Sequence, residues 1–331
     1  MARPLLTERP PCGRPACRFA APSAPLGDAL PPEHRRAAPP DLPALDEETL
    51  RTHFALLAQL ERAPWPGAAA AARAAHLPGL TRLHPEQPQE TIQGALEVLH
   101  DVARALAALT GLERFSLQPR TFETAARGAL LVARASLART QPARTHLVAP
   151  AGSLALRLAR HARLQPHPIE RLPSGELDID ALDEAVGDAT ALVAAAWLTP
   201  SGAFERGLTA AAEVAHTRGA LLAADATGLA RLAGHTRLRE AGVDIAWLHL
   251  AELCPEATGA AIGVRSPLTE ALPGPLVGKT PAGFELDAEL SRSIGPLALT
   301  PGHLDDALAV WIAIHTLGED GLRDRATRLA T

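Results

Sequence analysis

The chain has 331 residues, a formal net charge of −5 at pH 7 and 47% hydrophobic residues, which suits one large or two ordinary domains with a sizeable core. The acidic balance argues against a nucleic-acid-binding surface. The sequence has neither an apolar run of 18 residues nor a signal-like start. We therefore expect no membrane span and take the cytoplasm as the default location.

Residues 1–44 are rich in Pro and Arg and show little periodicity, which predicts an N-terminal arm that is partly disordered. Cys12 and Cys17 lie in this arm, separated by four residues and without a second pair. We interpret them as incidental thiols rather than half of a zinc site. The histidines form no H-x-x-x-H pattern, so no metal site is expected.

Two helices are predicted before the middle of the chain. Asp46 can cap the first, whose apolar face is Leu50, Phe54, Leu57 and Leu60. Pro64–Gly67 then breaks the chain. The second helix carries an apolar stripe from Ile92 to Leu109 and should end at Gly111.

Short apolar segments then alternate with helical ones. The expected strands are His146–Ala149, Ala191–Trp197, Ala220–Ala224, Ile245–Leu248 and Ala260–Val264. The expected helices are Ser153–Leu164, Ile179–Val186, Leu208–Thr217, Leu304–Leu317 and Gly321–Leu329. Unbroken apolar strands between helices indicate an α/β fold with a mostly parallel sheet covered on both faces.

Several motifs carry a family resemblance. Residues 83–97 read LHPEQPQETIQGALE, and shorter blocks follow at Ser116–Pro119, Gly175–Asp178, Gly242–Asp244, Ser293–Gly295 and Thr316–Arg323. They resemble glycine dehydrogenase (decarboxylating), the P-protein of the glycine cleavage system, and most of all its β subunit (subunit 2) in the two-subunit bacterial form. The resemblance covers about residues 45–331.

The resemblance implies a pyridoxal-phosphate-dependent transferase fold of type I with a seven-stranded sheet. Residues 45–300 would form its large domain, and residues 301–331 the start of a truncated small domain. In the family, pyridoxal phosphate is bound to a lysine as a Schiff base, glycine is decarboxylated, and the aminomethyl group passes to a lipoyl carrier protein. The implied partners are an α subunit or a second copy of the chain.

The same resemblance exposes a departure at the lysine. The family reads L-H-K-T after a strand, whereas this chain has Ala251 in place of the His and Glu252 in place of the Lys. A carboxylate cannot form an imine. The only lysine of the chain is Lys279, in the loop-like stretch Pro275–Pro281. It is either an unorthodox catalytic lysine or a solvated surface residue, and we favour the latter.

The phosphate turn and the ring contact also depart from the family pattern. The family's A-A-G-A-x-G turn is Arg120–Ala125 here, without glycine, and Glu123 would face the phosphate. Arg120 and Thr121 either bind an anion or begin a helix. Leu154 stands where the family has the His that covers the cofactor ring. The Ala-rich stretch from Pro64 to His76 has no counterpart of the family's substrate loop.

Two vestigial candidates for cofactor binding remain. Asp225 is retained where the family pairs an Asp with the pyridine nitrogen, although it can equally cap a loop. Thr199 begins a shortened form of a family loop. We therefore expect a non-catalytic homologue without a cofactor that acts as a structural or regulatory partner. The alternative is a functioning glycine dehydrogenase subunit.

Overall fold

The structure is a computed structural model, and it describes residues 87–330 except 139, 288–289 and 291. The arm 1–44, Cys12, Cys17, the helix expected after Asp46 and the stretch 64–76 lie outside the described residues.

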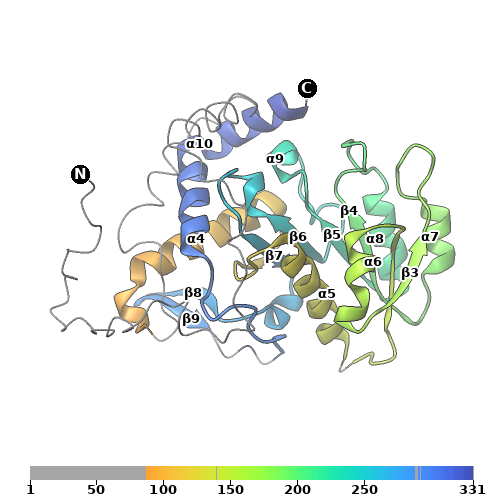
Figure 1. Ribbon diagram of the computed structural model, residues 1–331, viewed down its shortest axis with the longest axis horizontal. Helices are drawn as coiled ribbons and strands as arrows, with labels where there is room; N and C mark the ends of the chain where they lie inside the picture. The colour runs from red at the N-terminus through yellow and green to blue at the C-terminus, as the bar shows by residue number, and fades with distance from the viewer. Residues whose placement is uncertain (1–86, 139, 288–289, 291, 331) are drawn as a thin grey trace, which may run out of the picture. The chain divides into compact units, whose positions relative to one another are not determined.

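A seven-stranded sheet organises the described chain, in the order β1-β7-β6-β5-β4-β2-β3 (Figure 1). The strands are β1 (Arg114–Ser116), β2 (His146–Pro150), β3 (Gln165–Ile169), β4 (Thr190–Ala196), β5 (Leu221–Asp225), β6 (Ile245–His249) and β7 (Ala260–Val264). Strands β3, β2, β4, β5 and β6 run parallel to one another. Strand β7 pairs antiparallel with both β6 and β1. The predicted mostly parallel, seven-stranded α/β sheet is confirmed.

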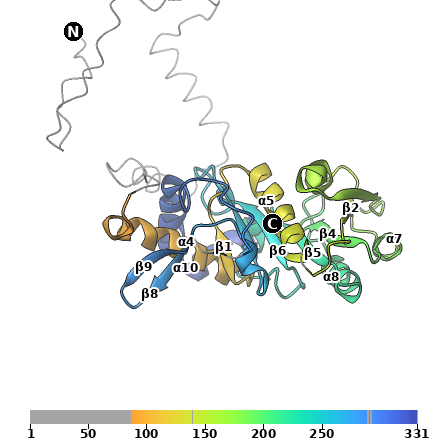
Figure 2. The same ribbon diagram turned by 90° about the horizontal axis from the view of Figure 1, so that it is seen from below.

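Helices cover both faces of this sheet. They are α4 (Gln93–Thr110), α5 (Phe122–Ala138), α6 (Leu154–Leu158), α7 (Ile179–Ala185), α8 (Leu208–Thr217), α9 (Leu229–Leu232) and α10 (Leu304–Ala330), with short 3-10 helices η2 (Gln89–Thr91), η3 (Ala159–Ala162), η4 (Leu250–Glu252) and η5 (Leu268–Ala271). Figure 2 shows α5 and α8 on opposite sides of the sheet. Side chains alternate along a strand, so Leu192 and Val193 of β4 enter two different cores.

Helix α4 follows its predicted pattern. Leu96, Leu99 and Leu106 of its stripe are buried, and Gly111 closes it with a φ of 76°, its N–H donating to the carbonyl of Ala107. Positive φ is cheap only for glycine, so the helix ends where the sequence indicated.

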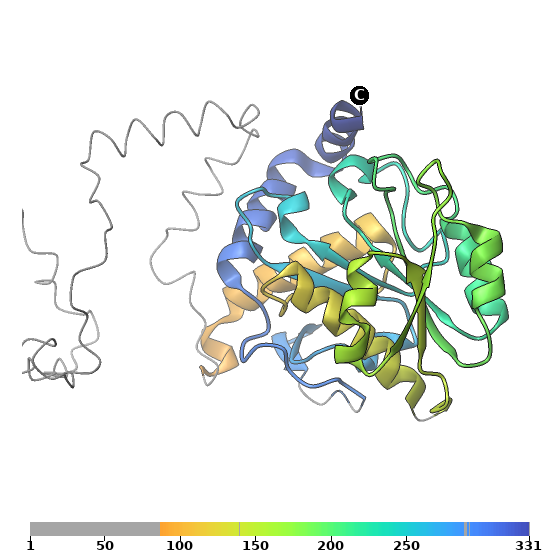
Figure 3. The same cartoon turned by 45° about the vertical axis from the view of Figure 1, so that its right-hand side comes forward.

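Helix α10 combines the two C-terminal helices that were predicted separately. Gly318 interrupts it with φ 63° and ψ −174°, and Figure 3 shows the resulting bend. The first part packs against α4, and α10 also contacts α9. None of the helices in the described ranges is long and apolar enough to cross a membrane.

The stretch around Lys279 differs from the prediction. Instead of a loop, it forms β8 (Leu276–Thr280), which pairs with β9 (Gly283–Asp287) in a separate two-stranded sheet. The side-chain amide of Gln93 in α4 donates to the carbonyl of Phe284 and accepts its N–H, both at 2.8 Å. These two long-range bonds hold the hairpin against α4. Local apolar periodicity did not reveal the hairpin.

One edge of the main sheet is β3, which contains Pro166 and Pro168. The N–H of Gln165 points back into the fold, toward the carbonyl of Thr145 at 2.8 Å. The carbonyl of Ile169 likewise accepts the N–H of Ala151 at 2.8 Å. Because backbone groups alternate sides along a strand, the two proline nitrogens lie on the free side.

Candidate active-site region

The candidate residues gather at the carboxyl ends of β2, β4, β5 and β6. Ligands of open α/β sheets bind at this edge. Two cavities lie there, of about 190 Å³ and about 350 Å³. Asp225, Leu154 and Trp247 are among the residues that line the smaller one. Glu252 and Arg325 are among those that line the larger one.

Asp225 ends β5 and caps the loop that follows. Its carboxylate accepts the N–H of Thr227 at 2.9 Å. Burial raises the pKa of Asp225, the bonds from Thr227 oppose that shift, and the negative charge of Glu252 adds to it. Ionisation of Asp225 is therefore less favourable than that of an exposed aspartate.

Glu252 ends the 3-10 turn η4 directly after β6, and its carboxylate is bound within the fold. The backbone N–H of Ala230 in α9 donates to Oε2 of Glu252 at 3.1 Å. Arg325 of α10 lines the same cavity and donates to the carbonyl of Leu253 at 2.9 Å. Burial lowers the pKa of Arg325, and the charge of Glu252 is the largest influence that opposes this shift. Glu252 therefore links η4 to α9 and, electrostatically, to the C-terminal helix.

Leu154 and Thr199 are placed differently. Leu154 lines the smaller cavity beside Asp225, directly after Ser153, whose hydroxyl accepts the N–H of Leu156 and caps α6. Thr199 is buried and its hydroxyl serves its own turn, lying 2.9 Å from the Ser201 hydroxyl and accepting the N–H of Ala203 at 3.2 Å. Thr199 does not line either cavity.

The segment that should hold a phosphate begins α5. The N–H of Thr124 donates to the hydroxyl of Thr121 at 3.1 Å, an ordinary N-terminal cap. Arg120 is exposed and lies 2.9 Å from Nδ1 of His303. Glu123, in the first turn, is exposed. The structure shows that a helix starts directly after Arg120 and Thr121, and anion binding there stays a prediction.

Three further residues of this region were not predicted. Phe122 of α5 stacks on His249 at the end of β6, with ring centroids 6.0 Å apart and an interplanar angle of 12°. The sequence could have indicated His249, because it lies three positions before Glu252. No sequence signal indicated that Arg325, 73 positions after Glu252, would line the same cavity.

Lys279 lies elsewhere. It is exposed on β8, with its ammonium 5.4 Å from the ring centroid of Phe284. Among the residues that line the two cavities, none is a lysine. The part of the chain that the structure describes also holds no cluster of three His, Cys, Asp or Glu side chains suited to a metal ion.

No protein-family model matches the chain. Its relatives include proteins named "Probable glycine dehydrogenase (decarboxylating) subunit 2". The one from Caldanaerobacter subterraneus is 29% identical over 92% of this chain and 67% of the relative. The relative from Thermus thermophilus is 29% identical over 98% of this chain and 73% of the relative. The relative from Kosmotoga olearia is 32% identical over 75% of this chain and 53% of the relative. The chain is a homologue of these subunit 2 proteins.

Solved structures agree on the fold of this subunit 2 homologue. A crystal structure of glycine decarboxylase (P-protein) of the glycine cleavage system matches with a TM-score of 0.67 and 24% identity, over 90% of this chain and 73% of that one. Oryza sativa TDC with PLP and tryptamine matches with a TM-score of 0.57 and 17% identity, over 88% and 68%. The chain has the fold of pyridoxal-phosphate-dependent enzymes of type I.

Proposed function

We propose that this chain is a non-catalytic homologue of glycine dehydrogenase (decarboxylating) subunit 2 that serves as a structural or regulatory partner of a glycine dehydrogenase subunit. The observation that carries the proposal is Glu252. By the resemblance to the family's L-H-K-T motif, Glu252 takes the place of the Schiff-base lysine. Its carboxylate accepts the N–H of Ala230 at 3.1 Å.

The surrounding residues do not fit pyridoxal phosphate. An imine requires an amine, and no lysine is among the residues lining the two cavities. The hydroxyl of Thr121 already accepts an N–H of the first turn of α5, and the adjacent Glu123 would repel a phosphate dianion. Leu154 offers an aliphatic contact where a ring would be covered. We therefore derive no reaction step through this cofactor.

The first test is a titration of the purified chain with pyridoxal phosphate. We expect no aldimine absorbance and no covalent label after borohydride reduction. The variant Glu252→Lys should also fail to form a stable imine, because its new ammonium would lie beside Arg325 and in front of the same defective phosphate turn. A stable imine in the parent chain, mapped to Lys279, would overturn the proposal.

The second test addresses the partner. The chain should co-purify with a glycine dehydrogenase α subunit when the two are co-expressed, and light scattering should show a defined complex. Isolation of the chain as a clean monomer, with no α subunit in pull-downs, would contradict the partner role.

The retention of Asp225 favours the alternative, a functioning subunit. In that case the chain and an α subunit together would release CO2 from glycine in the presence of a lipoyl carrier protein and pyridoxal phosphate. We expect no release above that of the α subunit alone.

A further inference from the structure

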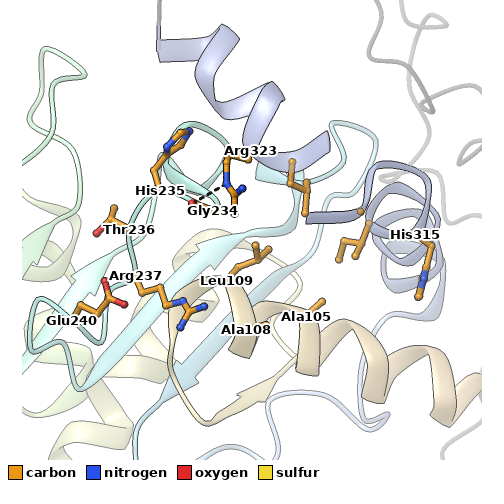
Figure 4. Close-up of a pocket in the computed structure, with 13 residues that line it drawn as sticks. Ala105, Ala108, Leu109, Gly234, His235, Thr236, Arg237, Glu240, His315 and Arg323 are labelled. Atoms are coloured by element: carbon orange, nitrogen blue, oxygen red, sulfur yellow. Dashed lines mark hydrogen bonds between the residues drawn. The ribbon is translucent and has the colours of Figure 1, made fainter. Parts of the chain in front are cut away.

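A cavity of about 570 Å³ lies apart from the candidate active-site region (Figure 4). The C-terminal half of α4, the loop 234–240 and α10 around Gly318 form it. Its volume falls within the range of small-molecule sites, roughly 300–1,000 Å³.

The floor of this cavity is apolar. Ala105, Ala108 and Leu109 come from α4, and Ile314 and Leu322 come from α10. Ile314 precedes the bend at Gly318 and Leu322 follows it. The bend thus lets one helix contribute side chains from both of its parts to the same hollow.

The rim of the cavity carries positive charge. Arg237 is exposed, and no described residue hydrogen-bonds or ion-pairs with its guanidinium. Nε of Arg323 donates to the carbonyl of Gly234 at 3.3 Å. Its guanidinium also lies 3.6 Å from the carboxylate of Asp320.

Figure 4 shows Arg237 and Arg323 entering from opposite sides, with Leu109 between them. Glu240, the one carboxylate that lines the cavity, lies on the far side of Arg237, away from the apolar floor (Figure 4). The charged group that faces the floor beside Leu109 is therefore the guanidinium of Arg237.

We propose that this cavity binds a small amphipathic anion, a carboxylate, sulfonate or phosphate on an apolar body. The anionic group would take charge-assisted hydrogen bonds from Arg237, whose planar fork suits such oxygens. The apolar body would lie on the α4 and α10 side chains. The site is separate from Asp225 and Glu252, so the proposal stands whether or not the chain is catalytic.

A pair of fluorescent probes distinguishes the contribution of charge to binding from the contribution of apolar contact. Anilinonaphthalenesulfonate and phenylnaphthylamine share an aromatic body, and only the first is anionic. In titrations of the full chain, we expect one saturable site for the sulfonate, weaker binding of the neutral probe, and displacement of the sulfonate by decanoate.

Substitutions then locate the site. Arg237→Gln should weaken sulfonate binding about tenfold, the size expected for one charge-assisted hydrogen bond, and leave the neutral probe nearly unchanged. Ala108→Phe should weaken both probes by filling the floor. The control Arg160→Gln, an exposed position on η3, should change neither. Circular dichroism and melting temperature identify any variant that fails to fold, and Arg237→Gln, at an exposed position, then decides alone.

Unchanged sulfonate binding in Arg237→Gln would overturn the proposal. So would equal weakening of both probes in that variant, which would indicate an apolar surface for a protein partner. Sulfonate binding that does not saturate would equally contradict a defined site.

Discussion

Asp225 and Glu252 place two carboxylates at the ends of neighbouring strands, and their repulsion contributes to a raised pKa of Asp225. Its pKa in the folded chain is raised by burial and by Glu252. Between the ordinary pKa of 3.8 and the raised one, the folded state binds more protons than the unfolded state. Stability therefore falls as pH rises through that window, and the loss persists at neutral pH.

Asp225→Asn should remove this loss. The amide oxygen can still accept the N–H of Thr227, and no charge faces Glu252. We expect a higher melting temperature at pH 7 than in the parent, with the difference vanishing below pH 3.8. Asp188→Asn, at an exposed position, is the control and should have no effect. A lower melting temperature in Asp225→Asn at pH 7 would show that the charge is needed.

Asp244 is a buried carboxylate that connects β5, α8 and the segment directly after β7. It is fully buried, accepts the N–H of Leu222 at 2.7 Å, lies 2.8 Å from Nε2 of His216 and pairs with Arg265. Asp244→Ala should lower the free energy of unfolding by about 1–3 kcal/mol, because the buried N–H of Leu222 loses its acceptor, measured by urea denaturation. Asp188→Ala serves as the exposed control. A loss below about 1 kcal/mol would mean that water replaces these bonds.

Among the individual residues of the candidate site, the sequence predicted the positions of some and not of others. Asp225 and Glu252 follow apolar strands, so their place at the sheet edge could be predicted. The partners of Glu252 could not, because Ala230 and Arg325 reach it through tertiary packing. The bond between Thr121 and Thr124 shows the helix start that was one of the two interpretations of this segment.

Among the elements, those with a strong local pattern were predictable. Helix α4 has Leu and Val at helical spacing, and α8 occupies the predicted Leu208–Thr217. Helix α5 was not among the expected helices because half of its buried residues are alanine, which gives only a weak apolar stripe. Strand β3 contains two prolines, which are unusual in strands. The β8–β9 hairpin is held by Gln93 of α4. The local sequence therefore predicts neither strand. The predicted helix Ser153–Leu164 is α6 followed by η3.

The bend of α10 depends on one residue. Gly318 has φ 63° and ψ −174°, and its missing Cβ would meet no atom within 4 Å. Gly318→Ala should therefore cost about 1–3 kcal/mol from backbone strain alone. Gly94→Ala, in the regular α4 and equally uncrowded, should instead stabilise by about 0.5–1 kcal/mol. Thermal unfolding of the pair measures both. A neutral Gly318→Ala would show that α10 can straighten at no cost.

At the scale of the molecule, the sheet separates two apolar cores. Val102 of α4 belongs to one core and Val132 of α5 to the other. Each Val→Ala change should lower the free energy of unfolding by roughly 2 kcal/mol. The double variant should equal the sum within about 0.5 kcal/mol, because the two sites share no partners. Equilibrium denaturation of the single and double variants tests this, and a larger deviation would reveal coupling through the sheet.

The prolines of β3 limit the ways in which this edge of the sheet can pair with another chain. Pro166 and Pro168 both present their nitrogens to the free edge and lack an N–H there. An incoming strand would find two consecutive donor positions empty, so this edge cannot template a continuous intermolecular sheet. Assembly with a second copy or with another subunit is thereby diverted from strand addition at this edge to contacts between side chains. This edge of the sheet is also protected against the ladder growth that begins fibrils.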